Sequence, residues 1–187
     1  MSVAVSRRRF TVDDYQRMEE AGILRAEDRV ELIDGEIVTK MTAGPRHSAS
    51  LDRAARSFIT KVGESAIVRV QGPVRLDLYN LPEPDLAVLR PRADFYVSNH
   101  PGPVDIMLVV EVAESSIDYD RETKASLYAR ANVPEYWLVD LNDKVLLRYS
   151  SPRGGAYQSL HRHQRGEALA PQMLPECVVS TDDLIPV

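Results

Sequence analysis

Apolar positions recur along the chain in two rhythms, one typical of helices and one typical of strands. Behind Thr11, a suitable N-cap, the residues Tyr15, Met18 and Ala21 recur at the three- to four-residue spacing of a helix. The same spacing of apolar residues predicts two further helices, over residues 48–62 and about residues 119–131. We therefore expect three main helices.

Alternation with a period of two predicts the strands. Residues 29–33 and 36–40 are short alternating runs joined by Asp34-Gly35, a dipeptide that suits a type I′ turn because both central residues need a positive φ. Residues 104–113 are almost continuously apolar, which is typical of a central strand covered on both faces. Further strands are predicted over residues 66–78 (bent or divided at Gly72-Pro73), 85–89, 135–141, 144–150 and 157–160. Together these elements predict an α/β fold with a mixed, twisted central sheet flanked by helices.

Length and composition suit one domain. A chain of 187 residues with 44% hydrophobic residues can bury one substantial core. We expect a single domain over residues 10–187, preceded by a flexible N-terminal arm over residues 1–9. The arm is polar and basic, and a solvated tail is favoured over a phosphate-binding arm.

Signals for a membrane or an oxidising compartment do not occur in the sequence. No apolar run is long enough for a transmembrane helix, and Arg7-Arg8-Arg9 is not followed by the apolar stretch of a signal peptide. The single cysteine, Cys177, excludes an intramolecular disulfide and a multi-cysteine zinc cluster. We expect a soluble cytoplasmic protein that does not bind membranes.

The formal net charge of -5 argues against a protein that coats nucleic acid without specificity. It does not exclude a nuclease, because an acidic metal site contributes negative charge of its own. The 23 basic residues can still form a local strip that faces phosphates.

Two carboxylates and an amine follow one another in the middle of the chain. Asp85 begins one predicted strand, Glu111 interrupts the most apolar strand, and Lys124 lies on the third predicted helix. If the two strands are adjacent, both carboxylates reach one side of the sheet, because residues two apart on a strand share a face. Leu127 and Ala131 would pack on the sheet and direct Lys124 toward its edge.

This set of side chains suits a Mg²⁺ site for phosphodiester hydrolysis. Mg²⁺ prefers oxygen ligands and commonly takes one or two protein carboxylates, together with waters and substrate phosphate oxygens. Asp85 and Glu111 would be the metal ligands, with Mn²⁺ as a substitute ion, and Lys124 would stabilise the attacking hydroxide. A glutamate in so apolar a run is unfavourable unless it is paired or bound to a metal. A structural ion pair between Glu111 and Lys124 explains the pattern equally well.

A resemblance to a known family adds to this interpretation. The motifs that carry it are Pro84-Asp85, Glu111-Val112-Ala113, Lys124 with Tyr128, and Val133-Pro134-Glu135-Tyr136-Trp137-Leu138-Val139-Asp140. Through them the chain resembles the Uma-type family of bacterial restriction-type endonucleases, within the PD-(D/E)xK nuclease superfamily. The resemblance runs from about Phe10 to the C-terminus and implies a restriction-endonuclease-like fold.

The resemblance also implies roles for particular residues. In the superfamily the lysine stands two residues after the second acid, a position that Ala113 occupies here, and the resemblance implies that Lys124 replaces it from the helix. Glu31 matches a family glutamate before the Asp-Gly turn, and the resemblance implies an additional metal ligand there. His47 and Gln71 are candidates for lining the site; for His47 a polar contact at the start of the helix is equally supported, and for Gln71 an exposed or turn-capping amide is favoured.

These observations predict a metal-dependent endonuclease that acts on DNA, and a homodimer would place one site on each strand of a duplex. The rival hypothesis is a catalytically inactive nuclease-fold protein with a binding or structural role, suggested by Ala113 and by the acidic net charge. A metal-dependent hydrolase of small phosphoesters is a third possibility, for which a narrow, closed pocket would be expected.

Overall fold

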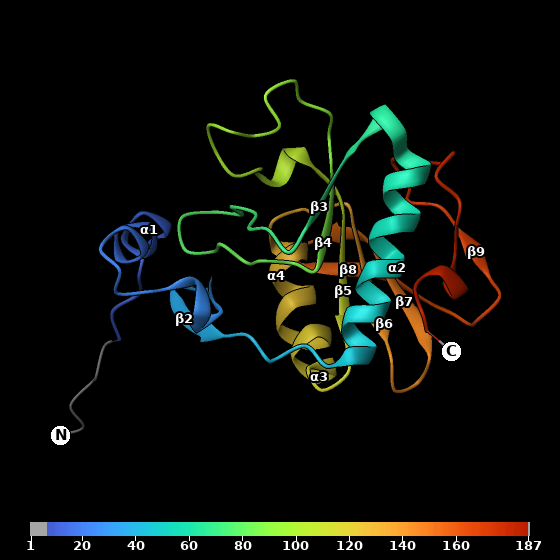
Figure 1. Ribbon diagram of the computed structural model, residues 1–187, viewed down its shortest axis with the longest axis horizontal. Helices are drawn as coiled ribbons and strands as arrows, with labels where there is room; N and C mark the ends of the chain where they lie inside the picture. Colours follow the sequence, from blue (N-terminus) through green and yellow to red (C-terminus); the bar gives the residue numbers. More distant parts are fainter. Residues whose placement is uncertain (1–6, 187) are drawn as a thin grey trace.

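A six-stranded mixed sheet forms the centre of the molecule. The computed structural model describes residues 7–186, and residues 1–6 of the predicted N-terminal arm lie outside that range. The strands follow the spatial order β3-β4-β5-β6-β7-β8. Their bounds are Ile67–Val70 for β3, Leu86–Leu89 for β4, Ile106–Ala113 for β5, Glu135–Asp140 for β6, Val145–Arg153 for β7 and Ala156–His163 for β8. The sheet is the mixed, helix-flanked sheet predicted from the sequence (Figure 1).

The sheet contains one parallel pair of strands, at its centre. β5 and β6 are parallel, and a helical crossover joins them; the other neighbouring strands of this sheet are antiparallel. Every residue of β4, β5 and β6 is buried, as expected for strands with near-continuous apolar sequence between two covered faces. The strand that carries Glu111 is therefore central.

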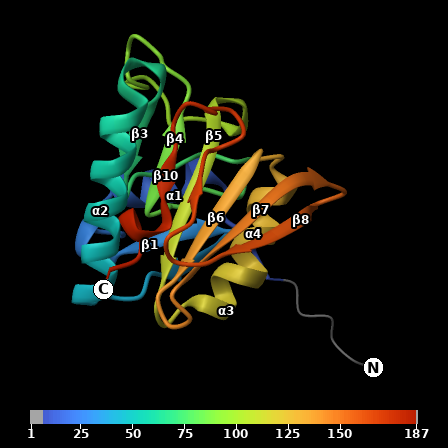
Figure 2. The same cartoon turned by 90° about the vertical axis from the view of Figure 1, so that its right-hand side faces the viewer.

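Helices cover both faces of the sheet. Helix α2 (Pro45–Val62) packs on one face through Leu51, Ala54 and Phe58, and the C-terminal segment closes the rest of that face. The opposite face is covered by a helical segment made of α3 (Ile117–Tyr119), a π-helical turn η4 (Asp120–Lys124) and α4 (Ala125–Arg130). Figure 2 shows α2 and the α3–α4 segment on opposite sides of the strands.

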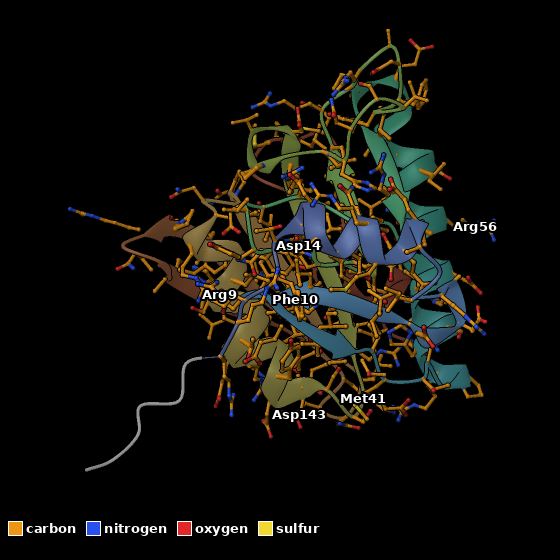
Figure 3. All side chains as sticks on the ribbon, turned by 90° about the vertical axis from the view of Figure 1, so that its left-hand side faces the viewer. Arg9, Phe10, Asp14, Met41, Arg56 and Asp143 are labelled. Carbon is orange, nitrogen blue, oxygen red and sulfur yellow. The ribbon has the colours of Figure 1, made fainter. Side chains whose placement is uncertain are left out.

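A smaller apolar cluster joins the N-terminal elements to the body. Helix α1 (Val12–Glu20) and the hairpin of β1 (Val30–Ile33) and β2 (Glu36–Thr39) share this cluster, which includes Leu32 and Leu81 (Figure 3). Thr11 caps α1 as predicted, and its side chain accepts a hydrogen bond from the Asp14 amide. The predicted Asp34-Gly35 turn is confirmed, with φ of 49° and 78°.

One prediction about local structure was wrong in part. The first of the two segments expected over residues 66–78 forms β3, which ends at Val70 because Gln71 has a φ of 44° and Pro73 cannot donate to a strand ladder. The second segment forms no strand, and the chain up to residue 85 is irregular apart from a single bridge between Leu81 and Leu32. Arg9, in the described part of the predicted arm, donates to the Asp34 carbonyl at 2.7 Å, and its guanidinium carbon lies 4.1 Å from the centre of the Tyr79 ring.

The remaining elements are short. They are the 3₁₀ turns η1 (Ala26–Asp28), η2 (Gly63–Ser65), η3 (Pro103–Asp105) and η5 (Thr181–Asp183), and the strand pair β9 (Ala168–Leu169) and β10 (Val179–Ser180). Within residues 7–186, no helix has the length and apolar character needed to cross a bilayer.

Candidate active site

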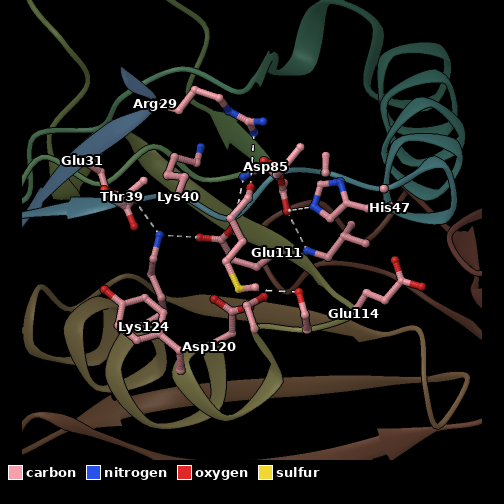
Figure 4. Close-up of a pocket in the computed structure, with 18 of the residues that line it drawn as sticks. Arg29, Glu31, Thr39, Lys40, His47, Asp85, Glu111, Glu114, Asp120 and Lys124 are labelled. Atoms are coloured by element: carbon pink, nitrogen blue, oxygen red, sulfur yellow. Dashed lines mark hydrogen bonds and ion pairs between the residues drawn. The ribbon is translucent and has the colours of Figure 1, made fainter. Parts of the chain in front are cut away.

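A pocket of about 380 Å³ lies where the β1–β2 hairpin, the start of α2, the start of β4 and the η4 turn meet. Its lining includes Glu31 of β1, Asp85 just before β4, Glu111 of β5 and Lys124 of η4 (Figure 4). His47 and Gln71, the two further candidates from the sequence, also line it. The fold thus brings all six candidate residues to one pocket.

Asp85 and Glu111 are joined through the backbone of two adjacent strands. Because β4 pairs with β5, the Asp85 amide donates to Glu111 Oε2 at 3.1 Å, and the Val112 amide donates to Asp85 Oδ2 at 2.9 Å. Both side chains are buried, with 6% of each residue exposed. Reciprocal bonds of this kind fix the two carboxylates relative to each other.

Lys124 lies between two carboxylates inside the protein. Its Nζ is 2.8 Å from Glu31 Oε2 and 3.3 Å from Glu111 Oε1. The Tyr128 hydroxyl donates to the same Glu111 oxygen at 2.8 Å, and the Glu83 amide donates to Glu31 Oε2 at 3.1 Å. The ammonium is therefore held on the side of Glu111 that faces the hairpin.

Negative charge exceeds positive charge in this pocket. Burial, together with Asp85 and Asp120, raises the pKa of Glu111 to about 7, even though Lys124 acts against the shift. For Lys124, burial acts to lower the pKa, but the carboxylates of Glu111 and Glu31 outweigh it and hold the pKa above its ordinary value. The ammonium is consequently charged, and the carboxylates around it are only partly neutralised.

Asp120 is a pocket residue that the sequence analysis missed. It begins the π-helical turn that Lys124 ends, and it is 5% exposed. Burial raises its pKa to about 6, although a hydrogen bond from Ser116 acts in the opposite direction. The Ser116 hydroxyl, at the N-terminal end of α3, donates to the Asp120 side chain. A π-helical turn, which often marks functional sites, has no local sequence signature that could have revealed it.

His47 and Gln71 both contact Asp85. The imidazole Nε2 of His47 lies 3.0 Å from Asp85 Oδ2, and this contact raises the pKa of His47. Burial acts to raise the pKa of Asp85, but His47 and the Val112 amide outweigh it, so the pKa lies below its ordinary value. The backbone amide of Gln71 donates to the Asp85 carbonyl at 2.9 Å. His47 therefore contacts the site through its side chain, whereas Gln71 is an exposed residue that reaches Asp85 through its backbone amide, in agreement with the exposed amide favoured from the sequence.

The donor set fits a hard divalent cation. Asp85 Oδ1 and Glu31 Oε1 accept no hydrogen bond from residues 7–186, and the buried carboxylates outnumber the buried ammonium. No group of three acidic, histidine or cysteine side chains in that part of the chain has a ready-made metal cluster geometry. A Mg²⁺ ion usually takes only one or two protein carboxylates and keeps several waters.

Several other polar and aromatic residues have structural roles. Tyr136 and Trp137 are fully buried in the core, and His163 Nδ1 lies 2.9 Å from Glu167 Oε2. Asp140 forms the turn after β6, accepting from the Asn142 and Asp143 amides at 3.0 Å. Ala113 is buried in the core, so the usual position of the superfamily lysine carries no charge here.

Comparisons with known proteins agree with this geometry. A crystal structure described as "a putative nuclease belonging to DUF820", from Anabaena variabilis ATCC 29413, superposes with a TM-score of 0.74 over 94% of this chain and 97% of its own, at 16% sequence identity. No curated protein matches the chain. The model of the Uma2 family, described as "Putative restriction endonuclease", matches residues 12–182. The chain therefore belongs to the Uma2 family.

Proposed function

We propose that this protein is a divalent-metal-dependent endonuclease that hydrolyses phosphodiester bonds in DNA. The observation that carries the proposal is the arrangement of Asp85 and Glu111 on paired strands, with the buried ammonium of Lys124 3.3 Å from Glu111. Membership of a family described as restriction endonucleases supports the reaction class. A phosphodiester is the substrate that such an acidic, cation-binding pocket suits.

Asp85 and Glu111 are the proposed ligands of Mg²⁺ or Mn²⁺, and Glu31 is a further ligand. When bound, such an ion lowers the pKa of an attacking water and offsets negative charge that develops on the phosphoryl oxygens. His47 and the Val112 amide hold Asp85 in place through its Oδ2, so its Oδ1 remains available to an ion.

Lys124 is proposed to stabilise the attacking hydroxide. Superfamily nucleases carry this lysine on the strand, but Ala113 occupies that position and is buried. The helix that follows β5 supplies the ammonium instead, and Glu31 and Glu111 position it. Geometry, and not position in the sequence, defines the role.

Cleavage of supercoiled plasmid DNA with Mg²⁺ or Mn²⁺ tests the proposal. Glu111→Gln is expected to lower the rate on the order of 100-fold or more, because it removes a charge that the metal and the transition state need. Glu64→Gln, the same change at an exposed position, is the matched control and should cleave like the wild type. Equal rates for the wild type and Glu111→Gln would contradict the assignment.

The alternative is a nuclease-fold protein that binds without cutting. The alanine at position 113 and the acidic net charge favour it. This alternative predicts that the protein binds DNA but does not cleave it in the presence of Mg²⁺ or Mn²⁺.

We also propose that the protein acts as a homodimer in the cytoplasm. Two copies related by a twofold axis would present one pocket to each strand of a duplex. Light scattering of the purified chain measures the mass directly, and a monomer at all concentrations would exclude the dimer.

A further inference from the structure

A second groove, of about 460 Å³, adjoins the active-site pocket. The two share three lining residues, Arg29, Lys40 and Gln71, which therefore form the boundary between them. The second groove is also lined by Arg25 and His100, which do not line the active-site pocket. A chain-like ligand that occupies one of them can continue into the other.

The two hollows differ in charge. The active-site pocket is lined by six carboxylates (Glu31, Asp85, Glu111, Glu114, Asp118 and Asp120) and three cationic side chains (Arg29, Lys40 and Lys124). The second groove is lined by three cationic side chains, Arg25, Arg29 and Lys40, and only two carboxylates, Glu19 and Glu83. A cation site thus lies beside a groove that favours anions.

Two of the cationic groups in the groove are available for a ligand. Arg29 forms no ion pair with the described residues, and its guanidinium donates only to the Met41 carbonyl, at a long 3.4 Å. Arg25 is 3.9 Å from Glu27, and both side chains are mostly exposed, so this contact is weak. Lys40, in contrast, is committed to Glu83, with contacts of 2.8 and 2.9 Å.

The backbone holds Arg29 at the boundary. Its φ of 49° is unusual for a residue with a side chain, and its carbonyl accepts a hydrogen bond from the Lys40 amide at 2.8 Å at the open end of the hairpin. Figure 4 shows Arg29 on the same side of the pocket as Asp85 and Lys40. The hairpin therefore presents a guanidinium next to the proposed metal ligands.

We propose that this second groove binds the phosphodiester backbone of the DNA strand next to the bond held at Asp85 and Glu111. Arg29 contacts the phosphate nearest the pocket, and Arg25 contacts a phosphate farther along the groove. A guanidinium suits this role because its donors match phosphate oxygens two at a time. The position of the strand relative to the cleaved bond rests on the proposed function, whereas the binding of phosphates in the groove does not.

The test is DNA binding by the full chain in EDTA, which prevents cleavage. Fluorescence anisotropy with a labelled duplex and with the labelled single strand gives the affinity at several salt concentrations. The variants are Arg25→Ala and Arg29→Gly; glycine at position 29 tolerates the positive φ, so it removes the guanidinium without straining the turn. Arg56→Ala, at an exposed position on α2, is the matched control.

Each groove variant is expected to lower the affinity about tenfold for at least one of the two DNA forms. Each should also reduce the salt dependence of binding by about one counterion, while Arg56→Ala changes neither. In cleavage assays Arg25→Ala should raise KM and leave kcat near the wild-type value, because Arg25 lines only the second groove.

Wild-type affinity in both groove variants, an equal loss in Arg56→Ala, or no DNA binding by the wild type would each overturn the groove proposal. The two proposals fail in different ways. If the wild type binds DNA through Arg25 and Arg29 but never cleaves it, the groove stands and the nuclease fails. If the wild type cleaves DNA and neither arginine matters, the nuclease stands and the groove fails.

Discussion

Burial of the Glu111 carboxylate is expected to lower the free energy of unfolding at pH values where the carboxylate is charged. Its pKa in the folded protein, about 7, lies above the ordinary value of 4.5, so the folded state holds the proton more tightly than the unfolded state. The free energy of unfolding should therefore fall as the pH rises from 4.5 through about 7. In EDTA at about pH 8, Glu111→Gln should be more stable than the wild type by about 1–3 kcal/mol.

Urea unfolding at about pH 5 and about pH 8 measures this difference. The advantage of the variant should shrink at the lower pH, where the wild-type carboxyl is protonated. A variant that is less stable at the higher pH would show instead that Lys124 requires the charge of Glu111.

Lys124 can be tested for a purely structural role. Lys124→Met alone leaves Glu31 and Glu111 buried without their cation and should cost about 3–5 kcal/mol. Adding Glu31→Gln removes one of the stranded charges and should recover most of that loss, since replacing a buried ion pair is often nearly neutral. We expect the double variant to fold, by circular dichroism and urea unfolding, and to cleave no DNA. If this double variant cleaves DNA at the wild-type rate, the ion pairs of Lys124 with Glu31 and Glu111 have only a structural role.

The sequence revealed those site residues whose charge conflicts with an apolar setting. Glu111 stands in a strand that is otherwise apolar, and this conflict pointed to it directly. Asp120 gave no such signal, because it lies among polar residues and becomes buried only when the helical segment packs on the sheet. The role of His47 could not be decided from the sequence, because its partner Asp85 is 38 residues away and only the fold brings the two side chains together.

The β1–β2 hairpin is the element that carries Glu31 to the site, and its turn is tightly constrained. A Cβ at Gly35 would lie 2.6 Å from the Arg9 Cβ, and Gly35 has a φ of 78°. Gly22 has a similar φ of 68° but no atom within 4 Å of the same position. Alanine at position 22 therefore tests the cost of the positive φ alone, and alanine at position 35 tests that cost together with steric overlap.

Gly35→Ala should therefore destabilise more than Gly22→Ala. The left-handed backbone costs about 1–2 kcal/mol in both variants, and the overlap with Arg9 adds about 1–3 kcal/mol in Gly35→Ala alone. Thermal unfolding measures the difference, and a plasmid assay should show slower cleavage by Gly35→Ala only, because the hairpin also positions Glu31. Equal losses of stability would mean that the φ angle alone matters.

At the scale of elements, periodicity predicted what the local sequence determines and missed what packing determines. The hairpin, α1, α2 and the buried strands follow directly from apolar spacing and turn residues. The π-helical turn at Asp120–Lys124 has no such local signal, and it buries Asp120 and Lys124.

In the whole molecule, the sheet holds segments from four parts of the chain around one pocket. The adjacency of β4 and β5 was assumed in the sequence analysis, because pairing between strands depends on the path of the chain as well as on local pattern; the structure confirms it. The C-terminal segment completes the face of the sheet that α2 covers, and it contacts α2 through Ser50, Arg53 and Ser57. By covering this face, the C-terminal segment and α2 support the strands that carry the pocket residues.

Asp183 is the charged link in this closure and should make it sensitive to acid. It accepts hydrogen bonds from Lys61 at 2.9 Å and Ser57 at 3.0 Å, and these contacts, led by Lys61, hold its pKa below 3.8. A lowered folded pKa means that the stabilisation is complete above the unfolded pKa of 3.8 and is lost as the pH falls through the folded pKa. Asp183→Asn should thus cost about 0.5–1 kcal/mol at neutral pH, a value reduced by solvent screening, and nothing in strong acid. Asp52→Asn, at an exposed position on α2, is the control for urea unfolding across this pH range. The same loss at every pH would assign the effect of Asp183 to packing and not to its charge.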